Sequence, residues 1–339
     1  MSQNLLINDN EYLLLIEKIK EDIQNAQYRA SMSANSALLL LYYNIGKEIN
    51  AHKMWGNKFV DNLSMDIQRE FPNAKGYSVR NLKYMAKFAT TFSDEQIVQQ
   101  LVAQLPWGHL TVILDKVKDY EAKIWYISQN IELGWSRNVL VHQIESQLYE
   151  RQSLAVKVNN FEGKLPPPQS ELATQVMKDP YIFDFIPFRT DMVERDIEEA
   201  LVREVTQLLF ELGKGFAFLG HQYHINVGGD DFYIDLLFYN LNLRCYFVIE
   251  LKTGDFKPEY AGQLNFYISA VDGILKKDQD NPTIGLLLCK NKNNVVAEYS
   301  LKDISKPMGI SEYKIIQTLP EELASDLPSV EDIQSRIRP

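Results

Sequence analysis

Two patterns of apolar residues divide the chain into two parts. Over residues 10–150, apolar side chains recur at helical spacings with few glycines or prolines between them. The first such stretch, about 11–50, predicts a helix or a helix pair, with spaced apolar residues at Leu13, Ile16, Ile23, Leu38, Leu41 and Ile45. A stripe of this kind usually packs into a core, and it could instead form the seam of a dimer.

The next helical segments outline a helix-turn-helix. The segment 59–70 predicts a helix, Pro72 and Gly76 break it, and Ser78 is a cap for a second helix. On this second helix, basic residues at spacings of three and four form one stripe, Arg80, Lys83 and Lys87. The stripe predicts contact with DNA phosphates, while a solvated amphipathic face is the alternative.

Further helices are expected at 94–105, 109–117, 120–133 and 136–151. Three consecutive prolines, at 166–168, cannot continue a helix and favour an extended spacer. We therefore expect a helical domain for DNA or partner binding over 1–152, a linker over 153–175, and a second domain over 176–339.

The second domain combines one helical segment with several strands. A helix over 191–212 precedes strands at 216–227, 232–240 and 245–252, with a hairpin turn at Gly228–Asp231. A helix over 258–275 follows, then a strand at 283–290 and a further one at 313–320. The predicted class is a two-domain protein, all-helical followed by an α/β core of the order αβββαβ.

The composition of the chain adds only weak constraints on its domain organisation and function. A length of 339 residues favours two domains, and a formal net charge of −10 argues against strong unspecific nucleic-acid binding. Cys245 and Cys289 fall on apolar strand-like runs, which favours buried thiols over metal or redox roles. The sequence shows neither a signal peptide nor a long uncharged apolar run, so we expect a cytoplasmic protein without membrane contact.

Candidate chemistry lies on the second and third strands. Glu250 and Lys252 are two residues apart and so face the same side of a strand, and Asp235 can reach the same edge of the sheet. Two converging carboxylates repel each other unless a cation joins them, and Mg²⁺, or Mn²⁺, suits carboxylate ligands with the Leu251 carbonyl as another. Lys252 would position water or stabilise charge on a phosphate, which predicts phosphodiester hydrolysis.

Two helices offer further site residues. Gln263 and Tyr267 are four residues apart on one helical face, which could look back at the metal site and touch the DNA backbone or a terminal phosphate. Glu198 lies beside the apolar stripe of the preceding helix and is a candidate carboxylate, with Glu194 and Glu204 as competitors. His221 and His224 would face opposite sides of a strand and make a poor metal pair.

The combined pattern resembles the YhcG-type family of bacterial proteins with a PD-(D/E)XK nuclease domain. The segments that carry it are FYIDLLFY, FVIELKTG and GQLNFY, together with LSMDIQREFPNAKGYSVRNLKYM and QLPWGHL in the helical part. The resemblance implies a winged-helix-like DNA-binding domain and a restriction-endonuclease-like domain. It assigns Asp235 and Glu250 as the acids, Lys252 as the lysine, Gln263 and Tyr267 as the Gln-X-X-X-Tyr element, and Glu198 as a helix-borne acid. Ile234 replaces the proline that precedes the first acid in the motif.

These observations predict a metal-dependent DNA nuclease that acts in defence, restriction, recombination or repair. Its expected partners are DNA, a second copy of the chain, and restriction-modification or recombination proteins. Two alternatives are a DNA-binding module that does not cleave and a scaffold subunit in which residues 1–150 serve oligomerisation. The cluster of Asp235, Glu250 and Lys252 argues against the first, because charged groups on an apolar strand are costly without a use.

Overall fold

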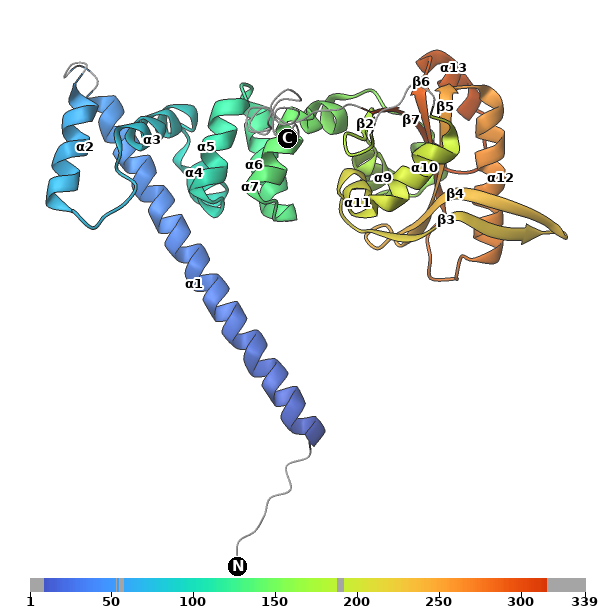
Figure 1. Ribbon diagram of the computed structural model, residues 1–339, viewed down its shortest axis with the longest axis horizontal. Helices are drawn as coiled ribbons and strands as arrows, with labels where there is room; N and C mark the ends of the chain where they lie inside the picture. Colours follow the sequence, from blue (N-terminus) through green and yellow to red (C-terminus); the bar gives the residue numbers. More distant parts are fainter. Residues whose placement is uncertain (1–8, 53, 55–57, 188–191, 316–339) are drawn as a thin grey trace, which may run out of the picture. The chain divides into compact units, whose positions relative to one another are not determined.

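The computed structural model describes residues 9–52, 54, 58–187 and 192–315 (Figure 1). The chain forms two compact units, Met1–Ile144 (unit 1) and Glu145–Pro339 (unit 2). Within the described residues, no helix combines the length and the apolar character needed to cross a membrane.

Unit 1 is built from helices, as the sequence predicts. They are α1 Asp9–Ala51, α2 Phe59–Glu70, α3 Val79–Thr91, α4 Glu95–Gln100, η2 Val102–Gln104, α5 Trp107–Lys116, α6 Tyr120–Leu133 and α7 Arg137–Glu145. Side chains just before three of them accept a hydrogen bond from the first turn, Ser78, Asp94 and Asp119. These caps satisfy backbone N–H groups that have no partner inside the helix.

The first helical segment is one continuous helix, not a pair. Its C-terminal part packs into the core of unit 1 through the buried side chains of Leu39, Tyr42, Tyr43 and Ile49. A side chain at Gly46 would meet the backbone oxygen of Met85 at 2.0 Å, so α1 and α3 cross closely only because this residue is glycine.

The helices of the predicted helix-turn-helix form at the expected residues. Ser64 of α2 donates a hydrogen bond to the carbonyl of Tyr77 at 2.8 Å, which fixes the turn against α2. One face of α3 is buried through Leu82, Met85 and Phe88. A role of this pair in DNA binding stays a prediction.

Unit 2 contains a seven-stranded mixed sheet in the order β1-β7-β6-β5-β4-β3, with β2 paired to β7. Its strands are β1 Val158–Asn159, β2 Tyr181–Ile182, β3 Phe216–Val227, β4 Asp230–Asn240, β5 Cys245–Asp255, β6 Ile284–Asn291 and β7 Met308–Lys314. The pairs β3–β4 and β4–β5 are antiparallel, while β5–β6 and β6–β7 are parallel. This confirms the predicted order αβββαβ, although β7 begins before the expected strand at 313–320, of which residues 316–320 lie outside the described part.

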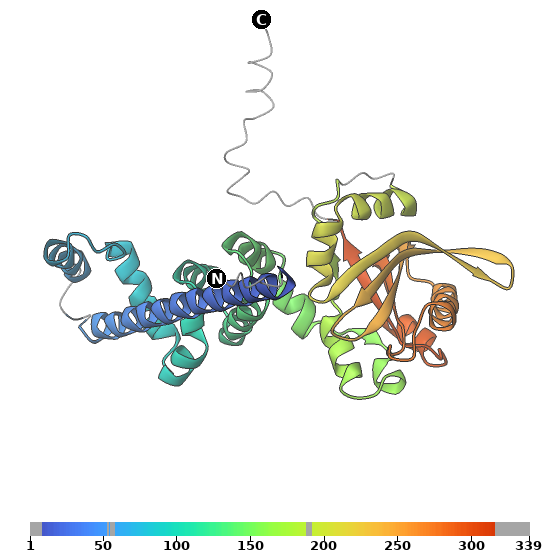
Figure 2. The same ribbon diagram turned by 90° about the horizontal axis from the view of Figure 1, so that it is seen from below.

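Helices cover both faces of this sheet (Figure 2). They are α8 Phe161–Lys164, α9 Gln169–Val176, α10 Glu194–Arg203, α11 Val205–Leu212, α12 Pro258–Ile274 and α13 Asn294–Leu301, with a π-helix, η3, at Glu150–Leu154. One apolar cluster joins α8 to α11 with Ile249 and Leu251 of β5. The other joins α12 and α13 with Val248 of the same strand. Alternation along β5 therefore directs Glu250 and Lys252 to the α12 side.

The residues expected to form a linker, 153–175, belong instead to unit 2. Val158 and Asn159 pair with β7, and the side chains of Phe161 and Leu165 are buried in the same cluster as α10. The physical reason is burial of these apolar side chains against the sheet, which outweighs the spacer character of the neighbouring prolines.

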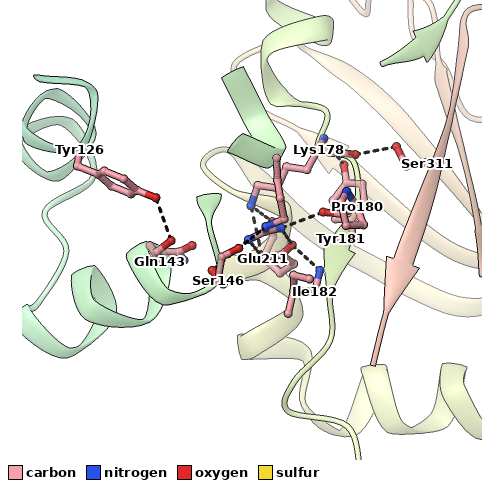
Figure 3. Close-up of polar contacts among 10 residues, drawn as sticks. Tyr126, Gln143, Ser146, Lys178, Pro180, Tyr181, Ile182, Glu211 and Ser311 are labelled. Atoms are coloured by element: carbon pink, nitrogen blue, oxygen red, sulfur yellow. Dashed lines mark hydrogen bonds and ion pairs between the residues drawn. The ribbon is translucent and has the colours of Figure 1, made fainter. Parts of the chain in front are cut away.

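A buried ionic cluster holds the residues on either side of this segment against α11 (Figure 3). Arg151 of η3 donates to Glu211 Oε1 of α11 at 2.5 Å. Lys178 also contacts Glu211, through the carbonyl oxygen and, at 3.6 Å, through Oε2. The amide of Ile182 donates to Glu211 Oε1 at 2.9 Å. We name this set the Glu211 cluster.

Candidate active site

The candidate site lies where β4 and β5 separate. Their pairing ends at Leu236 and Ile249, so the next residues, Asp235 and Glu250, stand at a fork in the sheet. Beyond the fork, β4 continues only with β3, as a hairpin that extends past the sheet (Figure 1). Backbone N–H groups at such a fork lose their partners in the ladder and need others.

Side-chain carboxylates supply those partners. Asp235 Oδ2 accepts a hydrogen bond from the amide of Leu251 at 2.9 Å. Glu250 Oε1 accepts from the amide of Asp235 at 3.4 Å. The two predicted acids are thus brought together, and both are buried, with Glu250 only 1 % exposed.

Lys252 is held among acidic groups at the end of this fork. Its Nζ lies 3.6 Å from Glu250 Oε2 and 3.4 Å from Glu194 Oε2, and 5.5 Å from the centre of the Tyr260 ring. Burial alone would lower the pKa of Lys252, but the charges of Glu250, Asp235 and Glu194 outweigh it and raise that pKa. The lysine is therefore charged at neutral pH.

Glu198 of α10 joins the site through Gln222 of β3. Gln222 Nε2 donates to Glu198 Oε2 at 2.5 Å and to Asp235 Oδ1 at 3.3 Å. Since β3 pairs His221 with Leu236 and Tyr223 with Ile234, Gln222 stands opposite Asp235. Its backbone has a φ of 44°, in the left-handed region.

Sequence reasoning missed Gln222 and treated Glu194 only as a competitor of Glu198. Neither Gln222 nor Glu194 is part of a sequence pattern that predicts its position in the site. Glu194 lies one helical turn before Glu198 and also accepts from the Thr253 amide at 3.5 Å. Both positions depend on how α10 packs beside the fork, which no local pattern encodes.

The carboxylates of the fork raise one another's pKa. For Glu250, burial and then the charge of Asp235 raise the pKa well above its usual value. For Glu198, burial and then Asp235 act in the same direction. For Asp235, burial raises the pKa, although the Leu251 amide and Lys252 oppose it. Three buried carboxyl groups thus lie near one lysine, and a bound cation would favour their ionised form.

The two predicted residues of α12 lie together beside this group. Gln263 Nε2 donates to the Tyr267 hydroxyl at 3.3 Å. The pKa of Tyr267 is raised, first by burial and further by the charges of Glu250 and Asp235. Tyr267 is therefore within electrostatic reach of the carboxylates, and its contact with a substrate stays a prediction.

A pocket of about 600 Å³ opens onto the acids from the side of α10 and β3. Its lining residues are Glu194, Arg195, Glu198, Glu199, His221, Gln222, Tyr233 and Asp235. His221 therefore lines the pocket, whereas His224 Nε2 lies 2.7 Å from Asp231 Oδ1. His224 is not among the lining residues of this pocket.

The donor chemistry of the fork suits a hard cation. Carboxylate oxygens are the ligands that Mg²⁺ prefers, and the excess of negative charge calls for a cation. Among the described residues, no cluster of three or more His, Cys, Asp or Glu side chains is already arranged around one ion position. Asp235 and Glu250 are the pair of donors that the backbone of the fork holds together, and the Leu251 carbonyl as a ligand stays a prediction.

The predicted basic stripe of α3 is exposed but partly neutralised. Lys87 Nζ lies 2.9 Å from Asp115 Oδ1, and the Arg80 guanidinium lies 5.7 Å from the centre of the Tyr84 ring. Lys83 is exposed on the same helix.

The two cysteines are buried, as predicted, and burial raises the pKa of both thiols to about 12.

Comparison with known protein families identifies both parts of the chain. Residues 174–328 match the YhcG PDDEXK nuclease domain, and residues 18–151 match the DUF1016 N-terminal domain. A protein of Escherichia coli (strain K12) named "Putative nuclease YhcG" is 29 % identical over 343 residues, covering 90 % of this chain and 90 % of that protein.

Solved structures with local likeness include a repair endonuclease from Pyrococcus abyssi, at 16 % identity and a TM-score of 0.26. It matches over 38 % of this chain and 50 % of its own. EndoMS in complex with double-stranded DNA shows 16 % identity over 39 % and 49 %, with a TM-score of 0.26. This chain thus spans about half the length of these structures, and scores this low add nothing to the fold described above.

Proposed function

We propose that the chain is a nuclease of the YhcG type, whose nuclease-domain model it matches over residues 174–328, and that it hydrolyses phosphodiester bonds in DNA with a bound divalent metal ion. The observation that carries this proposal is the fork itself. Asp235, Glu250 and Glu198 concentrate buried negative charge around one charged lysine, at the edge of a pocket. A structural cluster would balance its charges, whereas this one leaves a place for a cation.

Asp235 and Glu250 would hold the metal, with the Leu251 carbonyl and Glu198 as further ligands. When bound, Mg²⁺ or Mn²⁺ acidifies water and offsets the charge that develops on the phosphate. Lys252, kept protonated by its carboxylate neighbours, would orient the attacking water or stabilise the phosphate in the transition state. Gln222 would fix the orientation of two acids at once.

Substrate contacts would come from two places. Gln263 and Tyr267 of α12 would bind the DNA backbone or a terminal phosphate. In unit 1, the α2–α3 pair would bind DNA as a helix-turn-helix through Arg80 and Lys83, with Lys87 shared with Asp115. A cytoplasmic role in defence, restriction, recombination or repair fits such an enzyme.

The test is cleavage of linear, circular, branched and single-stranded DNA by the full chain, with Mg²⁺ or Mn²⁺ and with a chelator. We expect metal-dependent cleavage that Asp235→Asn abolishes and that Lys252→Ala slows by about 10²–10³-fold. Lys277→Ala is the matched control, because Lys277 is exposed in the loop after α12. Cleavage that persists in both site variants, or DNA binding without cleavage of any substrate, would overturn the proposal in favour of a binding module.

A further inference from the structure

Helix α1 carries a second apolar stripe that unit 1 does not use. Its members alternate at spacings of four and three, which is the heptad pattern of a coiled-coil seam: Tyr12, Ile16, Ile19, Ile23, Ala26, Ala30, Ser33 and Ala37. Tyr12 is 49 % exposed, Ile19 44 % and Ile23 52 %. We name these eight residues the α1 seam.

The α1 seam lies opposite the face of α1 that packs into unit 1. The packing face runs through Leu39, Tyr42 and Tyr43, and Leu39 is about 200° around the helix from Ala37. Figure 1 shows the N-terminal half of α1 extending beyond the other helices of unit 1. The seam is therefore a second, independent apolar surface on one helix, and the other helices of unit 1 leave it exposed.

We propose that α1 pairs with α1 of a second copy of the chain, in antiparallel orientation. The argument rests first on side-chain size. Large residues occupy the N-terminal half of the seam, from Tyr12 to Ile23, and small residues occupy the C-terminal half, from Ala26 to Ala37. A parallel pair would place large against large at one end and small against small at the other, which forces uneven spacing between the helices.

An antiparallel pair matches large with small in every layer. Centred between Gln24 and Asn25, it sets Ile23 against Ala26 of the second copy and Ile19 against Ala30. The same register sets Ile16 against Ser33 and Tyr12 against Ala37. The two-fold axis repeats each match, so the helix is complementary to itself along its whole overlap.

The flanking charges agree with the same register. Asp22 and Arg29 lie one heptad apart on one edge of the seam. In the antiparallel pair Asp22 faces Arg29 of the second copy, and the reverse contact follows from symmetry. In a parallel pair Asp22 would instead meet the uncharged Gln27. The overlap spans about three and a half heptads, enough for a two-stranded coiled coil.

This inference does not depend on the nuclease activity. It specifies how the helical unit would deliver two copies of unit 2 in one particle. The first test measures the mass of the full chain by light scattering and sedimentation, where a dimer has twice the monomer mass of 39.2 kDa. Ile23→Lys should raise the dimer dissociation constant at least roughly 100-fold, because it buries two unpaired charges.

Gln24→Lys is the matched control for that variant. Gln24 is the next residue along the helix, is exposed, and faces away from the seam. Its replacement should leave the dimer unchanged, and circular dichroism should show that both variants keep their helices. A wild-type monomer at roughly 100 μM, or an Ile23→Lys variant that still dimerises as wild type does, would overturn the proposal.

Two further variants test the orientation. Asp22→Arg and Arg29→Asp should each weaken the dimer about two- to fivefold, and the double swap should restore it. Ala30→Cys should not cross-link with itself, while the double variant Ile19→Cys/Ala30→Cys should. A disulfide formed by Ala30→Cys alone would show a parallel pair and would overturn the antiparallel register.

Discussion

The Glu211 cluster and the acids of the fork, both buried in unit 2, differ in their balance of charge. In the Glu211 cluster, one carboxylate receives Arg151, Lys178 and the amide of Ile182. At the fork, three carboxylates, Asp235, Glu250 and Glu198, share one buried lysine. Burial is tolerable in the first case because the charged groups all have hydrogen-bond partners, with Arg151 also donating to the carbonyls of Ser146 and Pro180, and it is costly in the second, where carboxyl groups outnumber cations. The difference separates a structural cluster from a candidate catalytic one.

The largest expected effect comes from unbalancing the Glu211 cluster. Glu211→Ala leaves Arg151 and Lys178 buried without their carboxylate and should lower the free energy of unfolding by about 3–5 kcal/mol. Denaturant unfolding of the full chain measures this. Glu171→Ala, at an exposed position of α9, should change it by less than about 0.5 kcal/mol. Equal stability of the two variants would contradict a structural role for the cluster.

At the fork, removing the lysine should affect catalysis rather than folding. Lys252→Ala should lower the rate of DNA cleavage by about 10²–10³-fold, because a positioned charge in a dry site stabilises the transition state. Its circular dichroism spectrum should match that of the wild type. Cleavage at the wild-type rate with an unchanged dependence on metal concentration would remove Lys252 from the mechanism.

Gln222 offers a smaller and more selective test. Gln222→Asn keeps an amide and a side chain that tolerates left-handed backbone, but it is too short to bridge Glu198 and Asp235. We expect about a 10-fold loss of cleavage rate and weaker apparent metal affinity, as is typical of groups that orient ligands. Gln207→Asn, at an exposed position of α11, is the control and should leave both quantities unchanged.

The smallest effect has the opposite sign to that of Glu211→Ala. Because the folded state raises the pKa of Glu250, its contribution to stability is present below the usual carboxyl range and is lost as pH rises through the folded pKa. Metal-free Glu250→Gln should therefore be more stable than wild type at neutral pH, by about 1 kcal/mol. Melting temperatures measured from pH 5 to pH 8 should fall less in the variant.

Added Mg²⁺ provides a second test of the difference between the wild type and Glu250→Gln. It should raise the melting temperature of the wild type and have little effect on the Glu250→Gln protein, since the lost carboxylate is a proposed ligand. If metal-free Glu250→Gln is instead less stable than the wild type, Glu250 has a structural role like that of Glu211, and its charge stabilises the fold.

Local sequence patterns determined most of the elements. The ranges of α2 and α3 were predictable because a serine cap, helix breakers and apolar spacing act over a few residues. The αβββαβ order and the pairing of Asp235 with Glu250 and Lys252 followed from consecutive apolar strands joined by short turns, the second of which connects β4 to β5 at 241–244. These signals act between neighbours in the chain, so the sequence alone carries them.

Tertiary packing decided the rest. Burial of Phe161 and Leu165 against the sheet made part of unit 2 from residues that resemble a linker. The place of α10 beside the fork brought Glu194, Glu198 and Gln222 to the acids, and the packing of α1 on α3 decided which of its two apolar stripes stays exposed. Each outcome depends on packing between segments that are far apart in the sequence. A pattern of neighbouring residues cannot predict which of the possible packing contacts is the most stable.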